Sequence, residues 1–162
     1  MQQEYEEKLR DYIRKNHIKA EQIFFENLVD HKENVLKTIK EKDIDFEDIV
    51  KTVVFLDLDK KLEHGNAVVG IVPANFRVSK EKLKLSCKSR IKIAGPEEVL
   101  ILTGYPAGGV PPFGFKARFY IEKTLLKKDV VYAGGGSIRT LIKTTIKEIL
   151  KANNAESVNI IE

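Results

Sequence analysis

The segment Gly108-Gly109-Val110-Pro111-Pro112-Phe113-Gly114 is the most unusual part of this sequence. Glycine adopts positive φ and lets the backbone approach its neighbours closely, whereas proline fixes φ and has no N–H donor. So dense a combination of the two predicts a stiff, irregular loop. A second cluster, Gly134-Gly135-Gly136-Ser137, also adjoins an apolar run. Two such loops indicate a site built from backbone groups rather than from a side-chain catalyst.

The segments around these loops show strand and helix patterns in mixed order. Apolar and alternating runs predict strands at 22–26, 49–58, 67–72, 91–93, 115–121, 130–133 and 138–142, with an edge strand at 157–161. Periodic and capped segments predict helices at 4–15, 30–42, 79–85, 95–104 and from 145 onward. The order lacks the regular alternation of a doubly wound sheet, so we expect an α+β fold with a mixed, curved sheet.

The length and composition are those of one globular domain. With 162 residues, of which 43% are hydrophobic and 32% charged, the chain is long enough to bury a core. Its apolar runs fall short of the ~18 residues of a membrane helix, and its polar start is unlike a secretory signal. Cys87 is the only cysteine, so we expect no internal disulfide and a cytoplasmic location. The net charge of +4 permits a polyanionic partner without requiring one.

Common catalytic signatures are absent from the sequence. There is no Gly-x-Ser-x-Gly elbow, and neither glycine cluster has the spacing of a P-loop or of a dinucleotide fingerprint. The histidines His17, His31 and His64 lie in unrelated segments, and a single cysteine cannot build a zinc cage. We therefore expect neither a metal nor another cofactor.

Lys51 stands out because it interrupts the apolar run from Ile49 to Phe55. Simple alternation would turn this side chain to solvent on an ordinary strand. Alternatively, its ammonium faces a pocket, where it holds a phosphate or a polarised oxygen. Spacing alone leaves both alternatives open.

Four segments together resemble the YbaK/ProRS-associated editing-domain family, in which ProRS stands for prolyl-tRNA synthetase. The segments are Val50-Lys51-Thr52-Val53-Val54-Phe55, Gly95-Pro96-Glu97-Glu98-Val99, Leu102-Thr103-Gly104-Tyr105-Pro106-Ala107 with the loop that follows it, and Gly134-Gly135-Gly136-Ser137. Their order and spacing fit the family over about residues 20–152. The resemblance implies a barrel-like sheet with surrounding helices. We expect one editing domain over residues 1–162, in which residues 1–16 form an N-terminal helical extension that is not part of the family motif and whose role is open.

The same resemblance implies a free-standing aminoacyl-tRNA deacylase that acts in trans. Such proteins hydrolyse the ester between a wrong amino acid and the terminal adenosine of a tRNA. Alanine or cysteine on proline tRNA are the best-known targets, and other members prefer different small residues. The implied partner is mischarged tRNA. An aminoacyl-tRNA synthetase is compatible as a second partner, whereas a membrane is not expected.

The resemblance also assigns roles to particular residues. The conserved lysine of the family falls on Lys51, which is expected to hold the terminal nucleotide and to favour the charged transition state. The Gly-x-x-x-Pro loop falls on Gly108 to Pro112, and its backbone amides are expected to position the ester carbonyl and the attacking water, with Gly108 and Gly109 as the catalytic residues of the loop. A hydroxyl of the terminal ribose helps to activate that water, which accounts for the lack of a side-chain base. The expected substrate-binding residues are His31, Val110, Pro111, Pro112, Phe113, Gly114, Gly134, Gly135, Gly136 and Ser137.

Several alternatives stay open at this point. His31 stands where family members often carry a histidine, so it either lines the pocket or is a surface residue at the start of a helix. The scaffold could hold a tRNA end or a synthetase without catalysis. It could also be an α+β domain whose glycine loops only turn corners.

Overall fold

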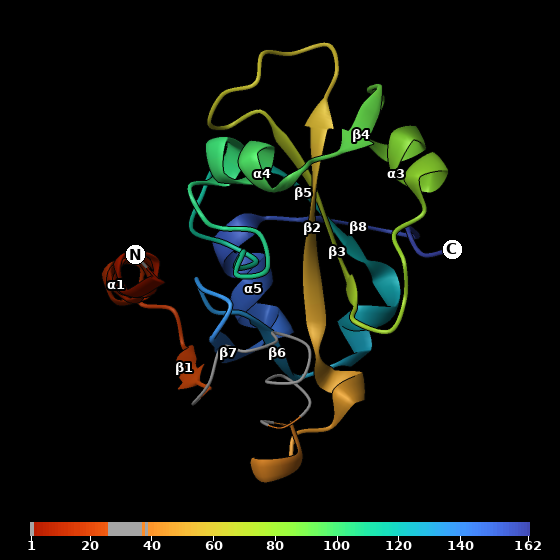
Figure 1. The fold of residues 1–162 in the computed structure, drawn as a ribbon. Helices are drawn as coiled ribbons and strands as arrows, with labels where there is room; N and C mark the ends of the chain where they lie inside the picture. Colours follow the sequence, from red (N-terminus) through yellow and green to blue (C-terminus); the bar gives the residue numbers. More distant parts are fainter. Residues whose placement is uncertain (1, 26–36, 38) are drawn as a thin grey trace.

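The computed structural model describes residues 2–25, 37 and 39–162, which form two β-sheets with helices around them (Figure 1). The elements in chain order are α1 (Gln2–Lys15), β1 (Glu21–Phe24), the 3₁₀ helix η1 (Phe46–Asp48), β2 (Val50–Asp57), β3 (Ala67–Pro73), α3 (Lys80–Cys87), β4 (Ile91–Ile93), α4 (Pro96–Thr103), β5 (Ala117–Glu122), the 3₁₀ helix η2 (Lys123–Lys127), β6 (Val130–Gly134), β7 (Thr140–Thr145), α5 (Ile146–Asn153) and β8 (Glu156–Val158). No helix of the described ranges combines the length and the apolarity needed to cross a membrane.

The two sheets differ in size and pairing. The smaller sheet has the strand order β1-β7-β6 and is antiparallel. The larger has the order β4-β2-β3-β5-β8, with β2 antiparallel to both of its neighbours and β5 parallel to both of its own. The mixed α+β fold expected from the sequence is therefore confirmed. The barrel-like closure is not found in the described residues, whose two sheets meet at a bridge between Ile49 and Tyr132.

The central strand of the larger sheet, β3, is buried on both faces. Every residue of β3 is buried, as its almost unbroken apolar sequence predicts for a central strand. Val69 and Ile71 belong to the main core, which is shared with β6, β7 and helix α1. Val68 and Val72 belong to a second cluster on the opposite face, under helix α3. This alternation leaves little freedom in the register of β2 and β3, so the start of β2 has a defined position.

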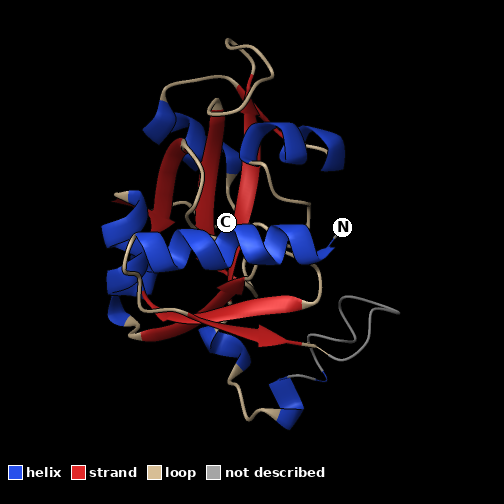
Figure 2. Cartoon of the chain, turned by 90° about the vertical axis from the view of Figure 1, so that its left-hand side faces the viewer, coloured by secondary structure: helices blue, strands red, loops and turns tan. Residues whose placement is uncertain are grey.

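Helix α1 crosses one side of the molecule, next to the strands of the smaller sheet (Figure 2). Leu9 is fully buried in the main core. The ring of Tyr12 stacks on Phe113 with 6.0 Å between the ring centroids. The helix predicted at 4–15 is therefore present, and it is packed into the core like any other element.

Most predicted elements are present with bounds shifted by a few residues. The strand expected at 138–142 instead begins at Thr140, because the Thr140 N–H donates to the carbonyl of Ser137 at 3.3 Å and closes a turn first. The helices η1 and η2 were not predicted, since such short segments have no apolar periodicity. Most of the helix expected at 30–42 lies outside the described residues.

Candidate functional site

A cavity of about 250 Å³ opens where β2, β6 and the glycine–proline loop meet. Its lining residues are Phe46, Ile49, Val50, Lys51, Thr52, Ala74, Gly108, Val110, Gly134 and Leu141. Lys51, Gly108, Val110 and Gly134 are residues that the sequence singled out, and they come from three distant segments. The structure therefore brings the lysine of β2 and both glycine clusters to one place.

The two glycine clusters pack directly against each other. The N–H of Gly136 donates to the carbonyl of Gly109 at 2.8 Å. A Cβ atom on Gly109 would lie 2.6 Å from the backbone of Ser137, and one on Gly134 would overlap the carbonyl oxygen of Val110. Glycine is needed here because the two backbones approach too closely for any side chain.

The backbone N–H groups of Gly108 and Gly109 differ in whether a ligand can use them. The Gly109 N–H donates to the carbonyl of Pro106 at 3.0 Å and closes a turn. Gly108 has a φ of +87° and occupies the third position of that turn, where a type II turn needs positive φ. The amide of Gly109 is thus already committed, which corrects the expectation that it faces the ester. Gly109 acts instead through its close contact with Ser137.

Two amides of the loop remain available at the cavity. The N–H groups of Gly108 and Val110 have no hydrogen-bond partner within the described part of the chain. Both residues line the cavity. These are the amides that the loop can offer to a carbonyl oxygen that gains negative charge.

Lys51 lies at the boundary between this cavity and a second groove on the same strand. It is partly buried, and among the described residues its ammonium has no hydrogen-bond or ion-pair partner. Burial, and then the neighbouring Arg77, lower the pKa of Lys51 below its ordinary value of 10.5. Lys51 thus lines two pockets of the described chain. An anionic ligand would relieve both unfavourable effects.

Two further residues of the cavity wall were missed by sequence reasoning. The hydroxyl oxygen of Thr52 is buried without a hydrogen-bond partner in the described residues. Phe46 in η1 leaves 42% of its surface exposed at the cavity. Alternation places the Thr52 side chain on the opposite face of β2 from that of Lys51, so no sequence signal connected Thr52 with the expected Lys51 site. No signal marked Phe46 either, since η1 itself was not predicted.

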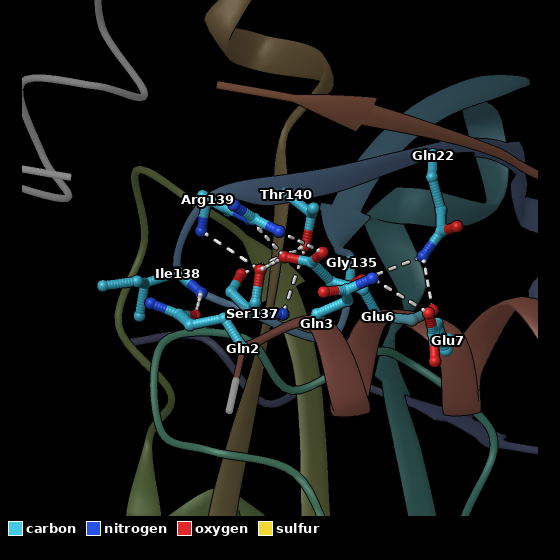
Figure 3. Close-up of polar contacts among 10 residues, drawn as sticks. All are labelled: Gln2, Gln3, Glu6, Glu7, Gln22, Gly135, Ser137, Ile138, Arg139 and Thr140. Atoms are coloured by element: carbon cyan, nitrogen blue, oxygen red, sulfur yellow. Dashed lines mark hydrogen bonds and ion pairs between the residues drawn. The ribbon is translucent and has the colours of Figure 1, made fainter. Parts of the chain in front are cut away.

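Helix α1 holds the second glycine cluster from outside, through a buried carboxylate (Figure 3). Glu6 is only 1% exposed. It accepts a hydrogen bond from the Ser137 hydroxyl at 2.7 Å, and bonds from Nε and Nη2 of Arg139 at 2.5 and 2.7 Å. The bonds from Arg139 contribute most to holding the pKa of Glu6 below 4.5. The charged carboxylate therefore ties α1 to the loop between β6 and β7.

Neighbouring polar groups extend this attachment (Figure 3). The side-chain amide of Gln22 donates to the carbonyl of Glu6 at 3.0 Å and to that of Gly135 at 3.4 Å. The N–H of Ile138 donates to the side-chain oxygen of Gln2 at 3.3 Å. The loop is thus held by α1 on one side and by the backbone of Gly109 on the other.

The Thr103-Gly104-Tyr105 segment has a structural role. The Thr103 hydroxyl donates to the carbonyl of Val99 at 2.8 Å and accepts from the Tyr105 N–H at 3.1 Å. Gly104 ends α4 in the left-handed conformation, and Tyr105 is fully buried. These residues determine where the glycine–proline loop begins, but they do not line the cavity.

The remaining residues expected at the site lie behind the cavity wall or outside the described chain. Phe113 is fully buried in the core, which places it away from the pocket it was expected to shape. The carbonyl of Pro112 accepts from the Asn153 side chain at 2.8 Å. The other supporting residues are Pro111, Gly114, Gly135, Gly136 and Ser137. His31 falls outside the described residues. In the described ranges, no three His, Cys, Asp or Glu side chains form a group that could hold a metal.

The sequence matches one family model over most of its length. Residues 30–152 match the model of the aminoacyl-tRNA editing domain. The YwhH protein of Bacillus subtilis (strain 168), whose function is uncharacterised, is 31% identical over 88 residues. That match covers 52% of this chain and 56% of YwhH, so the chain spans little more than half the length of this relative.

Solved structures share the fold over nearly the whole chain. The hypothetical protein APE2540 has a TM-score of 0.80 and 24% identity, over 96% of this chain and 99% of that one. A protein described as a proposed trans-editing enzyme for prolyl tRNA synthetase has a TM-score of 0.80 and 26% identity, over 98% of this chain and 97% of that one. Coverage this high includes helix α1, which lies outside the match to the family model.

Proposed function

Because the chain belongs to the aminoacyl-tRNA editing domain family, we propose that it hydrolyses the ester bond of mischarged tRNA in trans. The observation that carries this proposal is the cavity that joins Lys51 to both glycine clusters. The products are the free amino acid and a tRNA whose terminal ribose hydroxyl is restored.

The cavity suits a small aminoacyl group. Its volume of about 250 Å³ is below the roughly 300–1,000 Å³ of pockets that hold drug-sized ligands. Val110 and Leu141 contribute apolar surface to its wall. We propose alanine or cysteine on proline tRNA as the substrate, in keeping with the similarity to the proposed trans-editing enzyme for prolyl tRNA synthetase. Size alone discriminates by only about 1–3 kcal/mol per methylene, which is why a separate editing site is useful.

Lys51 binds the terminal nucleotide in this proposal. Its ammonium pairs with a phosphate oxygen of the terminal adenosine and so anchors the ester at the cavity. The pairing offsets the desolvation of the ammonium and its repulsion by Arg77, the two causes that lower the pKa of Lys51. The apolar ring of Phe46, exposed at the same cavity, offers a surface on which the adenine can stack.

The hydrolysis itself needs little from side chains. Water attacks the ester carbonyl carbon, the bond between that carbon and the ribose oxygen breaks, and the proton released by the water goes to the ribose oxygen. A hydroxyl of the terminal ribose assists the attacking water. The free amides of Gly108 and Val110 stabilise the negative charge on the carbonyl oxygen in the transition state. One such donor is worth about 10²–10³ in rate.

A deacylation panel tests this function. Alanyl-, cysteinyl- and seryl-tRNA specific for proline, together with other mischarged tRNAs, are incubated with the protein and with a Lys51→Met variant. We expect ester loss above buffer for at least one small amino acid, and a much slower loss with the variant. No loss above buffer with any of these tRNAs would overturn the proposal. Binding of all of them without turnover would indicate a binding module on the same fold.

A further inference from the structure

A second groove, of about 580 Å³, shares Lys51 with the catalytic cavity. We call it the basic groove. Its lining residues are Lys51, Val53, Phe55, Arg77, Val78, Lys80, Lys92, Ile93 and Glu162. Lys51, Val53 and Phe55 are alternate residues of β2, so they lie along one face of the strand. The groove therefore runs along β2, starting from the residue that marks the edge of the cavity.

The charges of the basic groove are unbalanced. Four cationic side chains line it, against the single carboxylate of Glu162. Among the described residues, the side chains of Lys51, Arg77 and Lys80 have no ion pair or hydrogen bond. Lys92 makes only a long contact, 3.8 Å from a carboxylate oxygen of Glu98.

Two other partly buried cations have close acidic partners. Arg118 lies 2.7 Å from Asp57, and Lys128 lies 2.8 Å from Asp48. In contrast, Lys51 is partly buried next to another cation, and its pKa is lowered by burial and by Arg77. Such a cluster of like charges is unfavourable in the free protein and becomes favourable when a polyanion binds.

The floor of the groove is apolar. Val53, Phe55 and Val78 supply it, and Ile93 of the edge strand β4 keeps 65% of its surface exposed. Cations above an apolar floor suit a single-stranded nucleic acid, because its phosphates and its base faces need different surfaces. A lone phosphate would use only one or two of the four cations.

We propose that the basic groove binds the phosphodiester backbone of the single-stranded 3′ end of an RNA and leads its last nucleotide to the cavity at Lys51. This inference rests on the proposed function, which by itself requires contact only with the terminal nucleotide. The groove adds contacts to the preceding phosphates, through Arg77 and Lys80 on one wall and Lys92 on β4. It therefore contributes to RNA affinity and not to the chemical step.

Binding of uncharged tRNA tests the groove without depending on hydrolysis. The test variant is Arg77→Gln with Lys80→Gln, and both side chains are exposed, so we expect the fold to be intact. The matched control is Lys60→Gln with Lys61→Gln, which removes the same charge from the exposed loop at the other end of β2 (Figure 1). Kd is measured over a range of salt, for intact tRNA and for the same tRNA without its single-stranded 3′ end.

We expect the test variant to bind intact tRNA roughly tenfold more weakly at low salt than the wild type. Its plot of log Kd against log salt should be shallower by about 0.7 for each phosphate that is no longer neutralised. The control should bind like the wild type, and removal of the 3′ end should abolish the difference between the variants. With mischarged tRNA, KM should rise for the test variant while kcat stays the same.

The outcomes separate this inference from the proposed function. Equal effects of the test and control substitutions would overturn the inference that the groove binds RNA, since the overall positive charge of the protein would then explain binding. So would an effect that survives removal of the 3′ end. Deacylation that does not depend on Arg77 and Lys80 would support the proposed function and overturn the inference about the groove. Binding that depends on the groove, without deacylation of any substrate, would support the RNA-binding inference and overturn the proposed deacylase function.

Discussion

The two walls of the cavity are built in opposite ways. The wall of glycine clusters consists of backbone packed on backbone, where Gly109 and Gly134 leave no room for a side chain and Glu6 ties the loop to α1. The wall of β2 consists of side chains whose polar groups lack partners within the described residues, namely the Lys51 ammonium and the Thr52 hydroxyl. The first wall is stabilised by its own contacts, whereas the second leaves polar groups available to a ligand.

This difference predicts two kinds of variant. Substitutions in the glycine wall should lower stability and activity together, because they displace the backbone. Substitutions in the β2 wall should lower activity while leaving stability unchanged or raised, because they remove groups that are unfavourable in the free protein.

The largest effect is expected for Gly134→Ala. The added methyl would overlap the carbonyl oxygen of Val110 and force the two loops apart. We expect a loss of about 3 kcal/mol in the free energy of unfolding, typical of overpacking, and a loss of most deacylation activity. Urea unfolding and the deacylation assay measure the two effects.

Gly95→Ala is the matched control for that substitution. Gly95 has a φ of −75°, and a Cβ atom there would meet only a side-chain oxygen of Glu98, at 3.7 Å. Its unfolding free energy and activity should stay close to those of the wild type. If Gly134→Ala behaved like Gly95→Ala, the close packing of the two loops would be unnecessary.

Lys51→Met should reduce kcat/KM by about 10²-fold without lowering the melting temperature. Methionine keeps most of the aliphatic stem and removes an ammonium that is unfavourable where it stands. Calorimetry together with the deacylation assay checks both parts. A lower melting temperature would show instead that Lys51 has a structural role.

The pH dependence of binding gives a second test of Lys51. Its pKa is lowered, so its positive charge is lost at a pH below the ordinary 10.5. The part of the tRNA affinity that depends on Lys51 should therefore disappear as the pH rises through that lowered value. Lys51→Met should not show this step when uncharged tRNA is titrated at several pH values.

Glu6→Gln tests the attachment of α1 to the glycine wall. The amide keeps the shape but weakens three hydrogen bonds to Ser137 and Arg139, so we expect a loss of about 1–3 kcal/mol in stability. Because the loop it holds forms one wall of the cavity, kcat/KM should fall roughly tenfold, by about 1.4 kcal/mol of transition-state binding. Glu7→Gln is the control, since it affects only an exposed bond to Gln3 at 3.1 Å.

The contribution of the Glu6 carboxylate to the free energy of unfolding should also depend on pH. A lowered carboxyl pKa means that the stabilisation is fully present above the ordinary value of 4.5 and is lost as the pH falls through the lower folded value. The stability difference between the wild type and Glu6→Gln should therefore shrink in acid. A difference that is constant from pH 7 to about pH 2 would contradict the role of the charged carboxylate.

The smallest effect is expected for Thr52→Val. Valine has the same shape and removes a buried hydroxyl that lacks a partner, so stability should be equal or higher. Activity should fall about threefold to tenfold if the hydroxyl contacts the substrate. Thr144→Val is the opposite control: its hydroxyl donates to the carbonyl of Lys19 at 2.8 Å, so stability should fall and activity should not.

Much of the fold could be predicted from the sequence because it depends on local patterns. The apolar run of β3, the alternation in β2 and the caps of α4 and α5 are visible in short windows, and the structure confirms these elements. The division of the strands into two sheets was not predicted. It depends on which distant segments pair, and no local pattern records that.

The candidate site was predictable in part for the same reason. Lys51, Gly108, Val110 and Gly134 were selected as unusual residues, and the structure brings them to one cavity. Phe113 was selected with them, but it belongs to the core, because a hydrophobic residue in a glycine–proline loop can face either way. The amide of Gly109 was expected at the site, but the turn that begins at Pro106 uses it.

The sequence by itself determined the helices and strands, the two stiff glycine loops and the resemblance to an editing domain, since these follow from local backbone preferences and from the order of motifs. Only the tertiary structure decided that the glycine loops pack on each other under a carboxylate from α1. It also decided that Lys51 lies beside Arg77 and Lys80 at the edge of an apolar groove. The reason is physical: close contact and unbalanced charge are properties of segments that meet in space, whatever their separation along the chain.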